Sequence, residues 1–183
     1  FGEPIHAQTA SPVAQKFLVP PFSVLSARDG DWQARKRAWA SMGIKGEVGR
    51  AENLGDYSDT CSLGEKDTSI FDPVLCEVVY RWFCPEGGQI IDPFAGGSVR
   101  GVVAACLGRK YWGSELRAEQ VEANREQAAQ LCRELTPQYV CGDSMETLAS
   151  APDADLVFSC PPYGDLETYS DDPRDLSGME WHT

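Results

Sequence analysis

Two short stretches of this chain hold residues whose types and spacing could do chemistry. In residues 89–98 a short apolar run ends in Asp92, and Pro, Phe, Ala and two glycines follow before an apolar helical stripe starts at Val99. Glycines let a backbone come close to a ligand, and a helix N-terminus offers N–H groups to an anionic group. The stretch therefore predicts a strand, a ligand-binding turn and a helix, the opening unit of a nucleotide-type α/β fold.

The second stretch is residues 155–163, where another buried-type strand ends in Cys160, Pro161, Pro162 and Tyr163. Proline restricts its own backbone and removes an N–H donor, so this strand end has a stiff backbone with few competing donors. A parallel α/β sheet gathers the carboxyl ends of its strands at one edge, where ligands bind. We therefore expect the two stretches to meet at one site.

The elements that must position these stretches follow from hydrophobic periodicity and capping residues. A helix over 31–39 is expected to be capped by Asp31, and a second helix starts after Asp72 with Pro73 in its first turn. Four strand-helix units in succession predict an α/β, Rossmann-like parallel sheet with right-handed crossovers. Its strands are expected at 89–92, 111–115, 138–141 and 155–159, and its helices at 99–107, 117–135 and a short segment ending at Leu148.

Two further acids end predicted strands. Glu115 follows Asp92 by 23 residues, and an acid about 20 residues beyond a glycine turn is where ribose hydroxyls are held. The alternative role of Glu115 is an acid that stabilises the dipole of the next helix. Asp143 ends the third strand, and its alternative role is a plain N-cap.

Composition limits the partners. The chain has 183 residues, 42% hydrophobic and 24% charged, and a formal net charge of −12. That charge opposes simple nucleic-acid binding, because phosphate contacts need Lys and Arg. Residues 22–50, however, hold six basic and three acidic residues. The triplet Arg35, Lys36 and Arg37 lies between two tryptophans, so it is either a phosphate-contacting patch or a solvated helix face.

The seven cysteines indicate a reducing, cytoplasmic location. Their number is odd, no pair has C-x-x-C spacing, and only His6 and His182 could join them as metal ligands, so no metal site is expected. The apolar runs are too short for a membrane span, and we expect no signal peptide. The chain opens on Phe1, which suggests a start upstream or a trimmed end.

The segment Asp92, Pro93, Phe94, Ala95, Gly96, Gly97 and Ser98 resembles the cofactor loop of S-adenosylmethionine-dependent amino-methyltransferases, Asp-Pro-Phe-x-Gly-Ser-Gly. Cys160, Pro161, Pro162 and Tyr163 resemble the family's catalytic motif, in which Asp, Asn or Ser precedes Pro-Pro-Tyr. Residues from about 19 to 179, including 20–50 and 165–175, are similar to phage and prophage DNA modification methylases.

The resemblance implies binding of S-adenosyl-L-methionine and DNA, and methylation of adenine N6 or cytosine N4. Glu115 would hold the ribose and Asp143 the adenine amino group of the cofactor. The side chain of Cys160 and the Pro161 carbonyl would accept hydrogen bonds from the target amino group, and Tyr163 would stack on the flipped base. Alignment of the amino nitrogen with the sulfonium methyl would then supply most of the catalysis.

Two residues depart from the family pattern. Ser98 stands where a glycine is usual, and Cys160 offers a sulfur acceptor that is weaker than oxygen, so Ser159 could take over. Three alternatives stay open: guanine-N2 methylation of RNA, a catalytically weak cofactor- or DNA-binding subunit, and carbon-5 methylation with Cys160 as nucleophile. The last conflicts with the usual place of that cysteine, after a single Pro.

The domain organisation expected from this resemblance is an N-terminal extension over 1–66 and a cofactor-binding catalytic domain over 67–183. Family members continue with more strands and usually a target-recognition region. We expect a sheet that is incomplete at its C-terminal side, which a longer chain or a second chain would complete.

Overall fold

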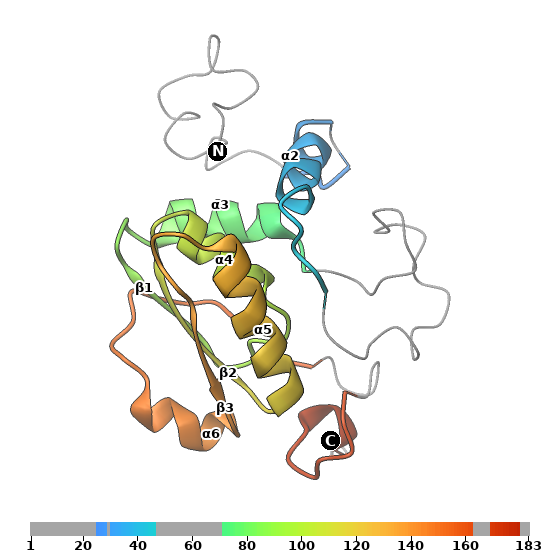
Figure 1. The fold of residues 1–183 in the computed structure, drawn as a ribbon, viewed down its shortest axis with the longest axis vertical. Helices are drawn as coiled ribbons and strands as arrows, with labels where there is room; N and C mark the ends of the chain where they lie inside the picture. Colours follow the sequence, from blue (N-terminus) through green and yellow to red (C-terminus); the bar gives the residue numbers. More distant parts are fainter. Residues whose placement is uncertain (1–24, 29, 47–70, 163–168, 180–183) are drawn as a thin grey trace.

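A computed structural model describes residues 25–28, 30–46, 71–162 and 169–179 (Figure 1). Its centre is a parallel four-stranded sheet in the order β3-β2-β1-β4, which confirms the predicted α/β, Rossmann-like class. The chain steps outward from β1 to β3 and then returns to the other side of β1, so the strand order reverses beside β1, where ligand crevices form in such sheets. The strands are β1 (Gln89–Asp92), β2 (Lys110–Glu115), β3 (Gln138–Cys141) and β4 (Leu156–Val157).

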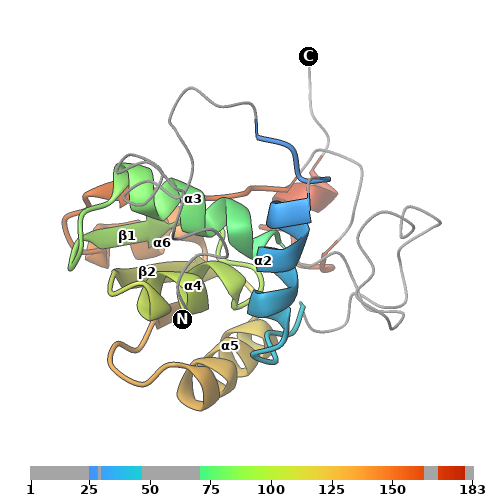
Figure 2. The same cartoon turned by 90° about the horizontal axis from the view of Figure 1, so that it is seen from above.

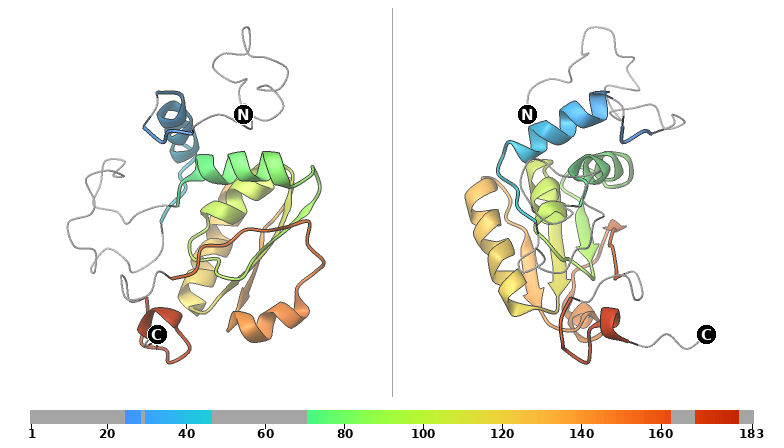
Figure 3. Two further views of the ribbon diagram at one scale, coloured as in Figure 1. Left: turned by 180° about the vertical axis from the view of Figure 1, so that it is seen from behind. Right: turned by 90° about the vertical axis from the view of Figure 1, so that its right-hand side faces the viewer.

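Three helices form one layer on the sheet: α3 (Pro73–Phe83), α4 (Val99–Cys106) and α5 (Ala118–Leu131), with α4 in the middle (Figure 3). Outside this layer, α2 (Gly30–Ala40) packs against α3 (Figure 2). The short helix α6 (Ser144–Thr147) lies on the opposite side of the sheet from α5 (Figure 1), and it continues into the 3-10 helix η3 (Leu148–Ser150). Among the described residues, no helix is long and apolar enough to cross a membrane.

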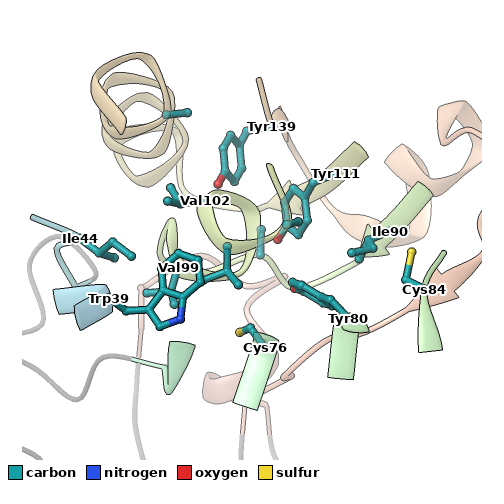
Figure 4. Packing of buried hydrophobic residues seen from close by; sticks show 14 of the residues in the cluster. Trp39, Ile44, Cys76, Tyr80, Cys84, Ile90, Val99, Val102, Tyr111 and Tyr139 are labelled. Carbon is teal, nitrogen blue, oxygen red and sulfur yellow. The ribbon is translucent and has the colours of Figure 1, made fainter. Parts of the chain in front are cut away.

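The core lies between the helix layer and the sheet (Figure 4). Tyr111 of β2 and Tyr139 of β3 pack with ring centroids 5.7 Å apart, and Trp39 of α2 is fully buried in the same cluster. The helix that contains Trp39 is therefore part of the same folded unit as the sheet. The predicted boundary between residues 66 and 67 lies outside the described residues.

Side-chain caps mark the start of two α-helices, α3 and α6. Asp72 is the N-cap of α3, as predicted, since its carboxylate accepts from Val74 N at 2.9 Å. Asp31 is not an N-cap, because α2 starts one residue earlier; its charge lies in the first turn, where it still favours the helix dipole. Helix α5 ends at Leu131 rather than 135, because Cys132 turns to an extended backbone after its N–H bonds to Ala128 O.

The fourth strand is shorter than predicted, Leu156–Val157 instead of 155–159. Backbone bonds from Asp155 N to Gln89 O and from Phe158 N to Ile91 O flank it at 2.9 and 3.0 Å. The next residue, Ser159, lies beyond the strand, and its hydroxyl donates to Asp92 Oδ1 at the end of β1. The catalytic stretch therefore starts directly where the sheet ends.

Candidate active site

The glycine turn between β1 and α4 is held against β2. Ala95 N donates to Ser114 O at 2.8 Å, and Gly96 has a φ of 49°, a left-handed conformation that favours glycine. A Cβ at Gly113 would lie 2.9 Å from the Ala95 Cβ, so only a glycine in β2 lets the turn pass this closely. The turn is thus shaped by its neighbours as much as by its own residues.

Asp92 lies behind this turn and does not face the cavity described below. It is fully buried, and its carboxylate accepts hydrogen bonds from Tyr111 Oη at 2.6 Å, Arg100 Nε at 2.5 Å and Ser159 Oγ at 2.5 Å. Phe94 N donates to the same carboxylate at 3.1 Å. These bonds make Asp92 an organiser of the turn and leave ligand contact to the residues in front of it.

Arg100 is a residue of the site that the sequence reasoning missed. It lies in the first turn of α4, pairs with Asp92, and also donates to the carbonyls of Phe94 and Ala95. Its guanidinium lies 4.6 Å from the ring centroid of Phe71. Burial opposes its charge, but the Asp92 carboxylate outweighs burial and raises the pKa of Arg100. A single basic residue in an otherwise apolar helix was the signal that could have found it.

Ser98 stands where the related loops carry glycine, and the structure shows where its side chain goes. It is the N-cap residue of α4 and is 2% exposed, and its hydroxyl donates to Gln127 Oε1 at 2.6 Å. The hydroxyl points to α5, so this departure takes no space from a ligand in front of the turn.

The two strand-end acids Glu115 and Asp143 both line the cavity. Glu115 accepts from Gly96 N at 2.9 Å and from Arg117 N at 3.0 Å, which joins the end of β2 to the glycine turn. Asp143 is the N-cap of α6, accepting from Met145 N at 2.9 Å. The capping role considered for Asp143 is therefore present, and its half-buried carboxylate also lines the cavity.

A cavity of about 560 Å³ opens at the carboxyl ends of the strands. This size is within the range of small-molecule sites, roughly 300–1,000 Å³. Three predicted residues, Asp92, Ala95 and Ser98, are buried outside its lining, and Tyr163 lies outside the described residues. The cavity brings together the other predicted residues of the two stretches with both acids: Pro93, Phe94, Gly96, Gly97, Glu115, Asp143, Cys160, Pro161 and Pro162.

A segment near the C-terminus forms an outer wall that the sequence reasoning did not assign. Tyr169 and Arg174 line the cavity from this segment, together with residues of the 3-10 helix η4 (Leu176–Gly178) and its surroundings. Asp175 holds the segment in shape, accepting from Ser177 N at 2.9 Å and from Ser170 Oγ at 2.7 Å. Figure 1 shows this segment near the carboxyl ends of the strands.

The basic triplet does not form one surface patch. Arg35 donates from two nitrogens to the carboxylate of Glu77, which is fully buried, so it fastens α2 to α3. Lys36 is mostly buried, lines the cavity, and has its Nζ 3.8 Å from Asp72 Oδ2. Only Arg37 of the three is exposed, so the three side chains do not form one exposed surface, and phosphate contact by the triplet stays a prediction.

The chain matches known proteins through solved structures only. No protein-family model matches the chain, and no curated protein matches its sequence. Solved structures do match, among them the crystal structure of a proposed RNA methyltransferase from Pyrococcus horikoshii, with 20% identity and a TM-score of 0.48. The match covers 76% of this chain and 65% of that one.

Proposed function

We propose that this protein transfers a methyl group from S-adenosyl-L-methionine to an exocyclic amino group of a DNA base, adenine N6 or cytosine N4. The observation that carries the proposal is the single cavity at the strand-order reversal, which joins the glycine turn, two strand-end acids and the Cys160-Pro161-Pro162 segment. Each of these parts would contact a different portion of the cofactor or the base in amino-methylation. The reaction therefore requires all of them in one site.

The chemistry of the lining fits the cofactor. Gly96 and Gly97 leave room at the start of α4 for a charged amino-acid group, Glu115 offers carboxylate oxygens to ribose hydroxyls, and Asp143 offers an acceptor to an adenine amino group. The cavity volume suits a ligand of this size. When bound, S-adenosyl-L-methionine supplies an electrophilic methyl group on its sulfonium.

The Cys160-Pro161 part of the lining carries the proposed acceptors for a base amino group. Cys160 and Pro161 line the cavity, and the sulfur and the carbonyl oxygen are the proposed acceptors of its two N–H bonds. Such contacts would turn the nitrogen lone pair towards the space in front of the glycine turn, where a bound cofactor would present its methyl group. Tyr163 is proposed to stack on the base, and the basic triplet, with Arg37 as its exposed member, is proposed to contact phosphate.

A second candidate, a cofactor-binding subunit with slow or no turnover, is favoured by one specific contact. The Ser159 hydroxyl could have replaced the weak sulfur acceptor, but it is engaged with Asp92 Oδ1 at 2.5 Å and Phe94 N at 3.1 Å. The amino group would then depend on Cys160 and backbone carbonyls. Measured turnover separates this candidate from an efficient enzyme.

The first experiment is methyl transfer from labelled cofactor, with phage DNA and bulk tRNA as parallel acceptors and mass spectrometry of the nucleosides. N6-methyladenine or N4-methylcytosine in DNA is the expected product. Label in tRNA guanine instead would replace DNA by RNA as the substrate. Cofactor binding measured by calorimetry without label in either acceptor would favour the binding subunit.

Variants of Cys160 test its role as an acceptor. Cys160→Ser is expected to keep or raise turnover, because oxygen accepts a hydrogen bond better than sulfur does. Cys160→Ala is expected to lose about 10²-fold or less, since the backbone acceptor survives. A nucleophilic Cys160 predicts the opposite: both variants inactive, and a covalent adduct between the unmodified protein and a 5-fluorocytosine oligonucleotide. That pattern would replace amino-methylation by carbon-5 chemistry.

A further inference from the structure

Ser159 lies at the point where the sheet gives way to the Cys160-Pro161-Pro162 segment. The last backbone hydrogen bond between β4 and its neighbour β1 runs from Phe158 N to Ile91 O at 3.0 Å. The Phe158 ring is then fixed edge-on against Tyr80, with centroids 5.6 Å apart. Beyond Phe158, the chain leaves the support of the strand ladder while it forms one wall of the cavity.

The Ser159 side chain spans the gap between this wall and the glycine turn. Its hydroxyl donates to Asp92 Oδ1 at 2.5 Å and accepts from Phe94 N at 3.1 Å. Asp92 ends β1, and the Phe94 backbone belongs to the turn that faces the cavity. The Ser159 hydroxyl therefore contacts both the end of β1 and the glycine turn, and Ser159 directly precedes the proposed acceptor residue Cys160.

The Asp92 carboxylate has other hydrogen-bond donors besides Ser159. Arg100 Nε and Tyr111 Oη both donate to Asp92 Oδ2, and Phe94 N donates to Oδ1. Removing the Ser159 hydroxyl would leave the buried carboxylate with these three donors. The Ser159 contact is therefore not the main source of hydrogen bonds to the Asp92 carboxylate. Its specific effect is to fix the position of Ser159 relative to the turn.

We propose that Ser159 is a positioning residue, which sets the distance and angle between the cofactor turn and the Cys160-Pro161-Pro162 wall by binding Asp92 and the Phe94 backbone. The proposal rests on the proposed function, because it matters only if a methyl donor on the turn must meet an acceptor held by that wall. Misplacement of reacting groups by about 1 Å can cost on the order of 10²-fold in rate. Ser159 would thus act on turnover more than on cofactor binding.

The test compares Ser159→Ala with Ser159→Thr, which keeps the hydroxyl. Ser150→Ala is the matched control, because the exposed Ser150 hydroxyl bonds to Thr147 O at 2.8 Å and does not line the cavity. Three quantities are measured: hydrogen exchange of the backbone amides of residues 158–160 in the ligand-free protein, affinity for S-adenosylhomocysteine, and kcat. Melting temperatures are recorded for each variant.

Ser159→Ala is expected to speed amide exchange at 158–160 and to lower kcat by about 10- to 100-fold, with affinity for S-adenosylhomocysteine within about threefold of the unmodified protein. Ser159→Thr should recover most of the kcat, and Ser150→Ala should change none of the three quantities. Unchanged exchange and kcat in Ser159→Ala would overturn the proposal. Equal losses of affinity and kcat that Ser159→Thr does not restore would also overturn it, because such losses would mean that Ser159 only stabilises the loop.

The exchange measurement keeps the two proposals separable. If the unmodified protein binds no S-adenosylhomocysteine and transfers no methyl group, the proposed function fails. Faster exchange in Ser159→Ala would then still establish the tie between the turn and the wall, and unchanged exchange would remove the tie as well.

Discussion

Asp92 and Asp143 are the same residue type at similar places in one parallel sheet, Asp92 as the last residue of β1 and Asp143 just after β3, yet their surroundings differ. Asp92 is 0% exposed and accepts hydrogen bonds from four protein groups. Asp143 is half-buried, caps the four-residue helix α6 through Met145 N, and lines the cavity. The first acid organises the turn behind the ligand site, and the second is placed to meet a ligand.

The difference comes from the helix that follows each acid. The first turn of α4 carries Arg100, whose buried guanidinium turns the Asp92 carboxylate inward. Helix α6 carries Met145 and Glu146 at its start, so nothing in its own first turn draws Asp143 into the core. For these two acids, the basic residue in the first turn of α4 and its absence from α6 accompany the inward and the cavity-lining positions.

The largest expected effect is on Asp92. Asp92→Ala leaves Arg100 buried without its carboxylate, and breaking a buried ion pair costs about 3–5 kcal/mol, so the free energy of unfolding should fall by that amount. Urea unfolding followed by circular dichroism at pH 7 measures it. Asp143→Ala serves as the comparison and should lose only about 1 kcal/mol, the value of an N-cap. Equal losses in both variants would erase the distinction between the two acids.

Glu115 combines both roles, and its replacement should affect the ligand. Glu115→Ala should weaken cofactor binding by about 2–3 kcal/mol, because hydrogen bonds to a charged acceptor are lost and the Gly96 backbone loses its anchor. Calorimetry with S-adenosyl-L-methionine gives the affinity, and Glu119→Ala on the exposed first turn of α5 is the control. Wild-type affinity in Glu115→Ala would place Glu115 with Asp92 among the structural acids.

Glu77 is another acid that stabilises the fold, and its contribution can be tested by varying the pH. Burial favours its neutral form, but the hydrogen bonds and charge of Arg35, helped by Trp39 and Arg81, lower the pKa of Glu77 below its ordinary value. A carboxyl group with a lowered folded-state pKa adds stability above its unfolded pKa, and that stability is lost as the pH falls through the folded-state pKa. Glu77→Gln should therefore be less stable than the unmodified protein by about 2 kcal/mol at pH 7.

The difference between the two proteins should shrink on acidification below the ordinary glutamate pKa. Urea unfolding between pH 7 and pH 2 measures it. A constant difference across this range would show that the charge of Glu77 does not hold α2 on α3.

The smallest expected effect is on ligand binding by Asp143. Asp143→Ala should lower cofactor affinity by about 1 kcal/mol, roughly fivefold, since one acceptor to the ligand is removed at a half-exposed position. Asp143→Asn keeps an N-cap oxygen and should preserve stability, so any loss of affinity in it reports on the ligand contact alone. Unchanged affinity in both variants would make Asp143 a capping residue only.

Local patterns predicted much of this molecule correctly. The alternation of apolar runs and amphipathic stretches predicted the parallel sheet, and Asp72 followed by Pro73 predicted the start of α3. The glycine turn, Glu115, Asp143 and Cys160 were expected to meet because parallel strands bring their carboxyl ends together, and they line one cavity. Short-range chemistry and the handedness of strand-helix units are sufficient for these features.

The sequence by itself determined which groups reach the ligand edge of the sheet, and the tertiary structure decided which way they face. Arg35 was grouped with Lys36 and Arg37 by adjacency, but its partner Glu77 lies 42 residues away. Asp92 was grouped with the ligand-facing loop, but Arg100 and Ser159 turn it inward. A charged side chain chooses its direction by the nearest opposite charge in a low-dielectric surrounding, and that neighbour is known only once distant segments have packed together.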